Sequence, residues 1–368
     1  METSLSLKLP HPHPLPSGEG ITPMTSFWRG KRVFITGHSG FKGSWLTLWL
    51  ESMGAKIGGY SLLPDYTPNL YSLLTIASRC EKNHIADIRD LSSLSAAIGA
   101  FAPQLVIHLA AQPLVRRSYR EPLDTISINA LGTANLLEAC RKVETLQAIL
   151  VVTSDKCYRN ASTAHREDDA LGGSDIYSAS KACADILTHA YRDSFFDIPV
   201  TTVRSGNVIG GGDWSEDRLI PDAVRAFSQD LPLTIRSPHS LRPWQHVAEA
   251  TLGYLMLARA MLQKNPVSSA YNFGPDRAFS VEHVIRQCAS LWQPAGQWRT
   301  EPSAIAEAPT LLLDASLAQR ELGWKPQLSF EETIRYTIDW YRDYYAKKPP
   351  AELYHAMISL CARLGSVD

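Results

Sequence analysis

Short apolar runs alternate with longer amphipathic stretches along the first half of the chain. Five short runs have the length of a strand, and most of them contain several Val, Ile or Leu residues: residues 31–36, 55–60, 104–109, 148–152 and 200–204. Two intervening stretches predict helices: 41–53, which has a broad apolar face, and 127–143. Because strands and helices alternate in this way, we predict an α/β fold built on a doubly wound (Rossmann) parallel sheet.

The pattern changes after residue 206, where a loop-rich segment with four prolines precedes an expected helix over about 245–263. Prolines near the N-terminus stand where a signal peptide needs an apolar helix, so this segment predicts a disordered tail, with Met24 as an alternative start. The expected units are a main domain of residues 27–206 plus about 244–275, a smaller α/β lobe of residues 207–243 and 276–345, and two tails, 1–26 and 346–368.

The composition excludes several classes of protein. The 368 residues carry 36 Lys+Arg and 37 Asp+Glu without a basic run, which argues against nucleic-acid binding. No segment approaches the roughly 20 apolar residues that span a bilayer, so we expect no membrane segment. The six cysteines are scattered, with no CxxC pair and no metal-ligand spacing. They indicate reduced thiols in a cytoplasmic protein that binds no metal.

The first candidate site is a glycine-rich turn over residues 36–43, which follows an expected strand and opens an expected helix. Glycines let the backbone approach a pyrophosphate, and a helix N-terminus offers unpaired N–H groups. The spacing GxxGxxG in this context predicts cofactor binding, and the alternative is a tight turn that serves helix–sheet packing. The residues assigned to the cofactor in this turn are Gly37, Gly40, Phe41, Lys42 and Gly43.

The second candidate site is the pair Tyr177 and Lys181. Residues four apart share one helix face, so the Lys181 ammonium can lie beneath the Tyr177 phenol. A neighbouring cation lowers the pKa of a phenol, and we therefore predict that Tyr177 is a general base near neutral pH. Tyr344 and Lys348 show the same spacing, but only the first pair follows a buried strand downstream of the glycine-rich turn.

The third candidate site is Ser154, Asp155 and Lys156, at the carboxyl end of the expected strand 148–152. Ligand chemistry in open α/β sheets gathers at such strand ends. Hydride transfer to a carbonyl needs only a hydroxyl donor and the Tyr–Lys pair, so the additional acid and base predict a second proton transfer, such as removal of a carbon-bound proton while a hydroxyl leaves. The alternative is a surface loop with an Asp–Lys ion pair, which contributes little.

Several runs together resemble the CDP-glucose 4,6-dehydratase family, a branch of the extended short-chain dehydrogenases/reductases. The resemblance covers roughly residues 27–345 and rests on these runs: FWRGKRV (27–33), GHSGFKGSW (37–45), AAQPLVRRSY (110–119), TSDKCY (153–158), YSASKACA (177–184), GNVIGGGDWSEDRLIP (206–221), RPWQHV (242–247) and YNFGP (271–275). It implies a redox-neutral dehydration of CDP-glucose on tightly held NAD, giving a 4-keto-6-deoxy sugar.

The same resemblance implies a role for each catalytic candidate. Tyr177, beside Lys181, takes the proton of the sugar C4 hydroxyl while hydride passes to NAD, and Ser154 hydrogen-bonds the C4 oxygen. Lys156 then takes the C5 proton and Asp155 protonates the departing C6 hydroxyl, before hydride returns to C6. In the related dTDP-glucose enzymes Glu follows the Asp, so Lys156 is a marker of the CDP branch.

Further residues follow from the resemblance alone. The cofactor set gains Asp87 and Ile88 at the adenine, Ala110, Ala111 and Gln112 at the nicotinamide, and the pair Tyr177 and Lys181. The expected ligands of the nucleotide-sugar are Asn207, Arg218 and Arg242, whose arginines suit a pyrophosphate. A surface ion pair is the alternative for each arginine.

Three segments depart from the expected pattern. No acidic residue follows the second strand where many NAD folds hold the ribose hydroxyls, and Asp65 lies further into the loop. Residues 159–176 are shorter than in the family, and 304–309 lack a His beside Glu307, so another nucleotide-glucose is an alternative substrate.

Other functions remain open. They are a 4-epimerase or reductase of the same superfamily, and a non-catalytic sensor of NAD or a nucleotide-sugar. Family members pair through two helices, which implies a homodimer or dimer of dimers through 127–143 and 177–192.

Overall fold

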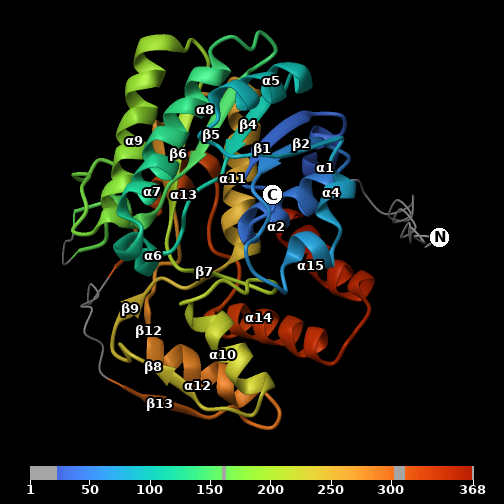
Figure 1. The fold of residues 1–368 in the computed structure, drawn as a ribbon, viewed down its shortest axis with the longest axis vertical. Coiled ribbons are helices and arrows are strands. Elements are labelled where there is room, and N and C mark those ends of the chain that lie inside the picture. Colours follow the sequence, from blue (N-terminus) through green and yellow to red (C-terminus); the bar gives the residue numbers. More distant parts are fainter. Residues whose placement is uncertain (1–22, 160–162, 302–310, 367–368) are drawn as a thin grey trace.

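A sheet of seven parallel strands forms the centre of the protein, in the spatial order β11-β6-β5-β4-β1-β2-β3 (Figure 1). The computed structural model describes residues 23–159, 163–301 and 311–366. The strands are β1 (Arg32–Thr36), β2 (Lys56–Ser61), β3 (Lys82–Ile85), β4 (Leu105–His108), β5 (Ala148–Val152), β6 (Val200–Ser205) and β11 (Ala270–Phe273). The doubly wound sheet is confirmed, and β3 and β11, which the apolar runs did not indicate, form its two edges.

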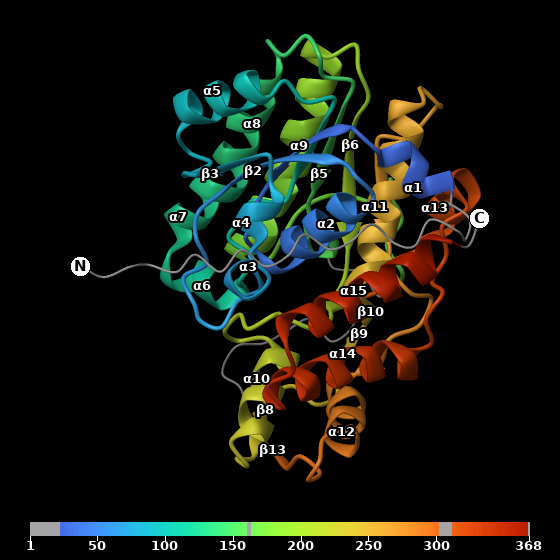
Figure 2. The ribbon, with the colours of Figure 1, turned by 90° about the vertical axis from the view of Figure 1, so that its right-hand side faces the viewer.

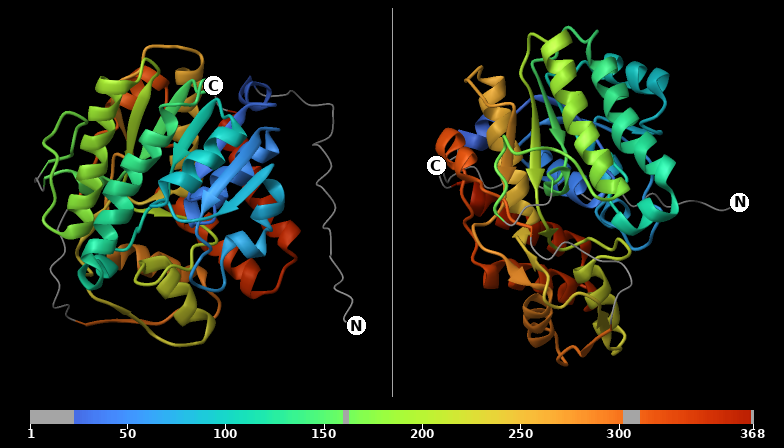
Figure 3. Two further views of the ribbon diagram at one scale, coloured as in Figure 1. Left: turned by 45° about the horizontal axis from the view of Figure 1, so that its top comes forward. Right: turned by 90° about the vertical axis from the view of Figure 1, so that its left-hand side faces the viewer.

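Helices cover both faces of the sheet because its strands are apolar on both sides. Along β1, Val33 and Ile35 belong to one hydrophobic core, whereas Phe34 belongs to the other. The helices of the first core are α2 (Phe41–Ser52), α11 (Val247–Leu262) and α15 (Pro350–Gly365), and those of the second are α5 (Leu91–Phe101), α8 (Gly132–Cys140) and α9 (Ile176–Phe195). Figures 2 and 3 show the strands between these two layers.

The expected helix over 127–143 is interrupted at its start. The chain passes through α6 (Val115–Arg120) and α7 (Pro122–Ile126) into a π-helical turn, η1 (Ser127–Leu131), before α8 begins. In the π-turn, the Asn129 amide nitrogen donates to the Ser180 hydroxyl of α9 at 2.9 Å and to the Gln112 carbonyl at 3.1 Å. The turn therefore ties the segment after β4 to the helix that carries Tyr177.

A smaller lobe lies beyond the carboxyl ends of the strands (Figure 1). The chain enters it from β6 through β7 (Val208–Ile209), which pairs with β10 (Gln245–His246). The elements of the lobe are α10 (Leu219–Ser228), β8 (Leu233–Ile235), β9 (Leu241–Arg242), β12 (Phe279–Ser280), α12 (Val281–Leu291), β13 (Trp298–Thr300) and α14 (Phe330–Tyr345). The short helix α13 (Ser316–Leu322) instead packs on β11 and α11.

Both ends of the described chain pack against the main body, although we expected tails there. The prediction of a tail over 346–368 is wrong for 350–365, because α15 buries Leu353, Met357, Leu360 and Leu364 against α2 and α11. These residues recur every three to four positions, which is the spacing of an amphipathic helix. At the other end α1 (Pro23–Trp28) buries Met24 and Trp28, and residues 1–22 lie outside the described part.

Candidate active site

The glycine-rich turn connects β1 to α2 and leaves space only for glycine at two positions. Gly37 has a φ of +74°, and a Cβ there would lie 2.6 Å from the Ala110 nitrogen. A Cβ on Gly43 would lie 2.1 Å from the Gly37 carbonyl oxygen. The N-cap residue Gly40 makes no side-chain capping bond, so the first amides of α2 point out of the helix without a side-chain partner. This geometry fits the pyrophosphate of a dinucleotide.

The residues expected at the adenine end lie beyond β3, after its carboxyl end. The Asp87 carboxylate accepts from the Arg89 guanidinium at 3.0 and 2.6 Å, and this interaction lowers the pKa of Asp87. Ile88 is buried beside Gly132 of α8. Asp65 is exposed and pairs with Arg117 at 3.2 Å. Both nearby carboxylates, Asp87 and Asp65, are thus paired with arginines. An adenosine bound here would mainly meet backbone groups and the apolar side chain of Ile88.

The segment after β4 lies against the glycine-rich turn. The Ala110 nitrogen donates to the Thr36 hydroxyl at 3.3 Å, and Ala110 and Ala111 are half-buried. Gln112 is turned into the protein, where its side-chain amide donates to the Leu114 carbonyl at 3.0 Å and to the Thr125 hydroxyl at 2.9 Å. Of the three residues expected at the nicotinamide, Gln112 therefore uses its side-chain amide for hydrogen bonds within the protein.

The catalytic candidates after β5 form a compact turn, η2 (Asp155–Cys157). The Ser154 hydroxyl donates to Asp155 Oδ1 at 2.9 Å and accepts from the Lys156 nitrogen at 3.2 Å. Asp155 is only 4% exposed, and its Oδ2 has no hydrogen-bond partner among the described residues. Burial raises the pKa of Asp155 against the positive charges of Lys156, Arg242 and Lys42. A buried carboxyl of this kind favours its neutral, proton-donating form.

Tyr177 and Lys181 lie in the first turns of α9, next to this segment. The helix begins where the Asp175 carboxylate accepts from the Ser178 nitrogen at 2.9 Å. The Lys181 ammonium is buried and donates to the Val152 carbonyl at 3.4 Å. Tyr177 is buried at the same site, as its position four residues earlier requires.

The pKa predicted for Tyr177 is wrong in direction for this structure. Burial raises the pKa of the Tyr177 phenol to about 12, although the Ser154 hydroxyl and the Arg218 charge act in the opposite direction. Burial also lowers the pKa of Lys181 to about 8, with Asp185 among the groups that oppose it. For Tyr177, loss of hydration outweighs the charge of Arg218, and residue spacing alone reveals neither effect.

Basic residues from distant parts of the chain meet at Asp155. Arg242 on β9 is buried and donates to the Leu241 carbonyl at 2.8 Å, and Arg218 before α10 lies 3.7 Å from the Asp213 carboxylate. Burial, with the charge of Arg218, lowers the pKa of Lys42 to about 7. Asn207 is half-buried after β6, and its carbonyl accepts from the Gln245 nitrogen at 3.1 Å. The structure thus brings the predicted arginines and the glycine-rich turn to one site.

The loop that precedes Arg218 contains Gly211 and Gly212 and is tightly packed. Cβ atoms on Gly211 and Gly212 would lie 2.2 Å from Trp340 and 2.4 Å from Leu70. The Trp45 indole donates to the Gly211 carbonyl at 3.0 Å, and the Asp213 nitrogen donates to the Tyr341 hydroxyl at 2.9 Å. These two glycines therefore allow α2 and α14 to pack against the loop that presents Asp213 to Arg218.

Sequence analysis missed three residues beside the site. Tyr66 lies next to Asp213 and Arg218, which both influence its pKa, although burial is the main reason that this pKa is raised. Asp185 and Arg204 form a buried ion pair behind the catalytic turn, with a separation of 2.7 Å. Asp185 continues the spacing of Tyr177 and Lys181 by one more helical turn, and Arg204 is a charge inside a buried strand. The helical spacing of Asp185 and the charge of Arg204 within an apolar strand could both have been noticed in the sequence.

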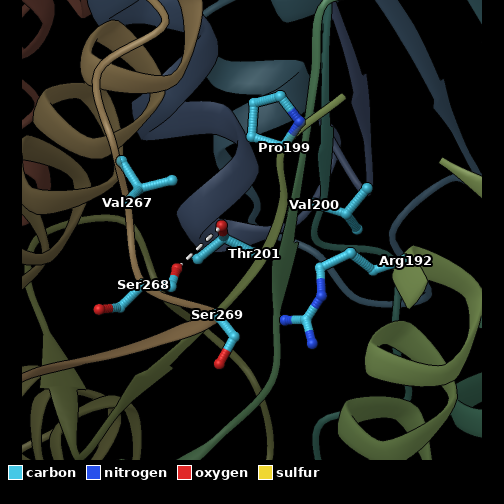
Figure 4. A pocket seen from close by; sticks show the side chains of 7 residues that line it. All are labelled: Arg192, Pro199, Val200, Thr201, Val267, Ser268 and Ser269. Atoms are coloured by element: carbon cyan, nitrogen blue, oxygen red, sulfur yellow. Dashed lines mark hydrogen bonds between the residues drawn. The ribbon is translucent and has the colours of Figure 1, made fainter. Parts of the chain in front are cut away.

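Other features lie away from this site. A cavity of about 210 Å³ opens at the amino ends of β6 and β11, the opposite ends from the catalytic turn (Figure 4). Within residues 23–159, 163–301 and 311–366, no cluster of His, Cys, Asp or Glu has the arrangement of a metal site. No helix in the same ranges is long and apolar enough to cross a membrane. The departure noted at residues 304–309 lies outside the described residues.

Comparisons with known proteins identify the family to which the chain belongs. The sequence model of the family described as GDP-mannose 4,6 dehydratase matches residues 34–337. A CDP-glucose 4,6-dehydratase of Salmonella typhimurium is 43% identical over 331 residues, 86% of this chain and 92% of that protein. A dTDP-glucose 4,6-dehydratase of Xanthomonas campestris pv. campestris is 29% identical, over 83% of this chain and 92% of that protein.

Solved structures show the same architecture. The UDP-glucose 4-epimerase of Thermotoga maritima, with UDP-glucose, superposes with a TM-score of 0.77 at 19% identity, over 85% of this chain and 99% of that one. TunA, an NAD-dependent NDP-hexosamine 5,6-dehydratase, gives a TM-score of 0.73 at 25% identity, over 85% of this chain and 98% of that one. Sequence, fold and site point the same way, and the chain belongs to the GDP-mannose 4,6-dehydratase family.

Proposed function

We propose that this protein converts CDP-D-glucose to CDP-4-dehydro-6-deoxy-D-glucose in an NAD-dependent, redox-neutral dehydration. The observation that carries the proposal is the buried carboxyl of Asp155 beside Lys156, in the site that also holds Tyr177 and Lys181. An epimerase or a reductase needs the tyrosine and the lysine of α9 but has no use for a second acid and base. The 43% identical relative named for CDP-glucose supports the choice of nucleotide.

NAD would bind at the turn over Gly37–Gly43 and supply a hydride acceptor and a positive charge at the nicotinamide. Tyr177 accepts the proton of the C4 hydroxyl, and the Ser154 hydroxyl orients the C4 oxygen. Once C4 is a ketone, the C5 proton is acidic and Lys156 removes it. Asp155 gives its proton to the C6 hydroxyl, which leaves as water. The hydride taken from C4 would be given back by NAD to C6, and a solvent-exchanged proton is delivered to C5, so the net change is the loss of one water.

The proposal is tested by incubating the purified protein with CDP-glucose in deuterated water, with and without added NAD. We expect a product lighter by one water, with solvent deuterium at C5 and no net NADH. An altered C4 configuration without water loss would identify a 4-epimerase, the activity of several proteins with this fold. Dehydration of a different nucleotide-glucose, with CDP-glucose left intact, would keep the reaction and change the substrate.

Replacement of Lys156 by Ala is expected to slow dehydration by about 10²-fold, at the low end of the usual range for a general base. The effect is limited because Lys156 is half-buried, so water can reach the position of its ammonium. Steady-state rates and deuterium incorporation at C5 measure the change, with the exposed Lys142→Ala as the matched control. Full activity and full deuterium incorporation in Lys156→Ala would remove this residue from the mechanism.

We also propose a homodimer that forms through α7, η1 and α9. Four large apolar side chains are exposed on these adjacent helices: Leu123, Ile126, Leu131 and Ile186. Exposed apolar side chains gathered in one region mark interaction surfaces. Light scattering should give the mass of a dimer, and Leu131→Lys/Ile186→Lys should give a folded monomer, whereas Leu231→Lys on the smaller lobe should change nothing. A monomeric wild-type protein at micromolar concentration would exclude this interface.

The cytoplasm is the location we propose for the enzyme. All six cysteines are free thiols in the structure, and a reducing compartment keeps thiols in this state.

A further inference from the structure

Asp185 and Arg204 form an ion pair that is shielded from water on all sides. The pair joins α9 to β6 with two parallel hydrogen bonds, from Arg204 Nε to Asp185 Oδ2 at 2.9 Å and from Nη2 to Oδ1 at 2.7 Å. Asp185 is fully buried and Arg204 is 1% exposed. The hydroxyl of Thr202 donates to the same carboxylate at 3.1 Å. The network is thus rigid and almost fully hydrogen-bonded.

The pair holds both ends of the catalytic turn. Before the turn, the Thr153 hydroxyl donates to Asp185 Oδ2 at 2.8 Å. After the turn, Arg204 Nη1 donates to the Tyr158 hydroxyl at 2.7 Å, and that hydroxyl donates to Asn272 Oδ1 at 2.7 Å. Ser154, Asp155 and Lys156 lie between these two anchors. The distance between the anchors is therefore fixed by the bidentate contact of Asp185 with Arg204.

Stability alone does not explain such a pair. Burying two charges carries a desolvation penalty, and well-packed apolar residues in place of a buried ion pair are often as stable. For catalysis, however, precise positioning can outweigh this desolvation penalty, because a displacement of about 1 Å at a reacting group can slow a reaction by ~10²-fold. Asp155 Oδ2 has no hydrogen-bond partner among the described residues, and Oδ1 is held only by Ser154 of the same turn, so the position of this carboxyl depends on the backbone on either side of the turn.

We propose that Asp185 and Arg204 are positioning residues, which fix the turn 154–156 by anchoring Thr153 and Tyr158. The proposal rests on the dehydration proposed above. Oxidation at C4 relies on Tyr177 and Lys181, which are held by α9 and by the Val152 carbonyl, and of these two only Lys181 feels the charge of Asp185. Loosening the turn should therefore impair water elimination more than oxidation.

The test compares the wild-type enzyme with Asp185→Leu/Arg204→Met and Tyr158→Phe. The double variant removes both charges and leaves neither unpaired, so the fold should persist. We expect its kcat for dehydration to fall by about 10- to 100-fold with KM changed less than about threefold, and enzyme-bound NADH to accumulate during turnover. Tyr158→Phe keeps the ring stacked on His165, 4.6 Å between centroids, and should show a smaller loss of the same kind.

Tyr271→Phe is the matched control, because it also removes a buried hydroxyl, one bonded to Ser268 and Glu321 at the amino end of β11. A purely structural role would lower the amount of NAD-loaded enzyme but leave kcat per loaded enzyme unchanged, without NADH accumulation. That result would overturn the proposal.

Amide hydrogen exchange gives a readout that is independent of substrate. Peptides over 153–158 should exchange faster in the double variant, while peptides over α2 keep the wild-type rate. Unchanged exchange over 153–158 would overturn the positioning role even if the enzyme proved to act on another nucleotide-sugar. A wild-type enzyme that leaves CDP-glucose intact would instead count against the proposed substrate, and the exchange result would still decide the role of the pair.

Discussion

Asp155→Asn is expected to lower the rate of dehydration by ~10²–10⁴-fold, the range for loss of a general acid, while C4 oxidation continues. Asn has nearly the shape of Asp and can still accept from the Ser154 hydroxyl, which lies 2.9 Å from Asp155 Oδ1. It has no acidic proton for the departing C6 hydroxyl, so the reaction should stop after C4 oxidation. Enzyme-bound NADH should then accumulate, and its absorbance is the primary measurement.

The pH dependence provides a second measurement of the same residue. Burial raises the pKa of Asp155, so its acid form persists to higher pH than in a free carboxyl group. The proton donor is lost as the pH rises through this pKa, and dehydration should fall with it. Asn does not titrate, so the residual activity of Asp155→Asn should lack this decline.

The control for this variant is Asp193→Asn, an exposed carboxylate paired with Arg192 at the end of α9. It should retain wild-type rates and pH dependence. Wild-type dehydration by Asp155→Asn, or failure of NADH to accumulate during slow turnover, would contradict the assignment of Asp155 as the acid.

The periodicity of the sequence was sufficient to predict the central sheet but not its edges. β1, β4 and β5 are buried on both faces and read as continuous apolar runs. β3 has the sequence Lys82–Ile85, mostly polar and exposed, because an edge strand has only one neighbour to pack against. The helix α15 was missed for a different reason: the spacing of its apolar residues is that of an amphipathic helix, but the sequence does not indicate that α2 and α11 cover its apolar face.

Short-range motifs were sufficient to predict the part of the site that is formed by residues close together in the sequence. The spacing of Tyr177 and Lys181 and the sequence Ser154–Lys156 identified groups that the fold does bring together. Which charges face one another across the site depends on segments more than 100 residues apart, such as Lys42 and Arg218, and the sequence has no local signal for that. The pKa of Tyr177 depends on burial for the same reason, because hydration is a property of the whole fold.

Tyr177→Phe is expected to abolish the first chemical step, with a loss of ~10²–10⁴-fold in overall rate. The phenol is buried and lies beside the Ser154 hydroxyl, where the C4 oxygen of the substrate would bind. Unlike Asp155→Asn, this variant should form neither NADH nor deuterated sugar, because the C5 proton becomes acidic only after C4 is a ketone.

The measurements that separate the two variants are NADH absorbance and deuterium at C5, with Tyr191→Phe, further along α9, as the matched control. Since burial raises the pKa of Tyr177 to about 12, the phenol is protonated at neutral pH before substrate and cofactor bind. The charge of Arg218 already lowers this pKa in part, and we expect Lys181 and the oxidised nicotinamide, once NAD is bound, to lower it further. Lys181→Met should then shift the rise of activity with pH to more alkaline values, whereas an unshifted profile would mean that Lys181 only supports Tyr177 mechanically.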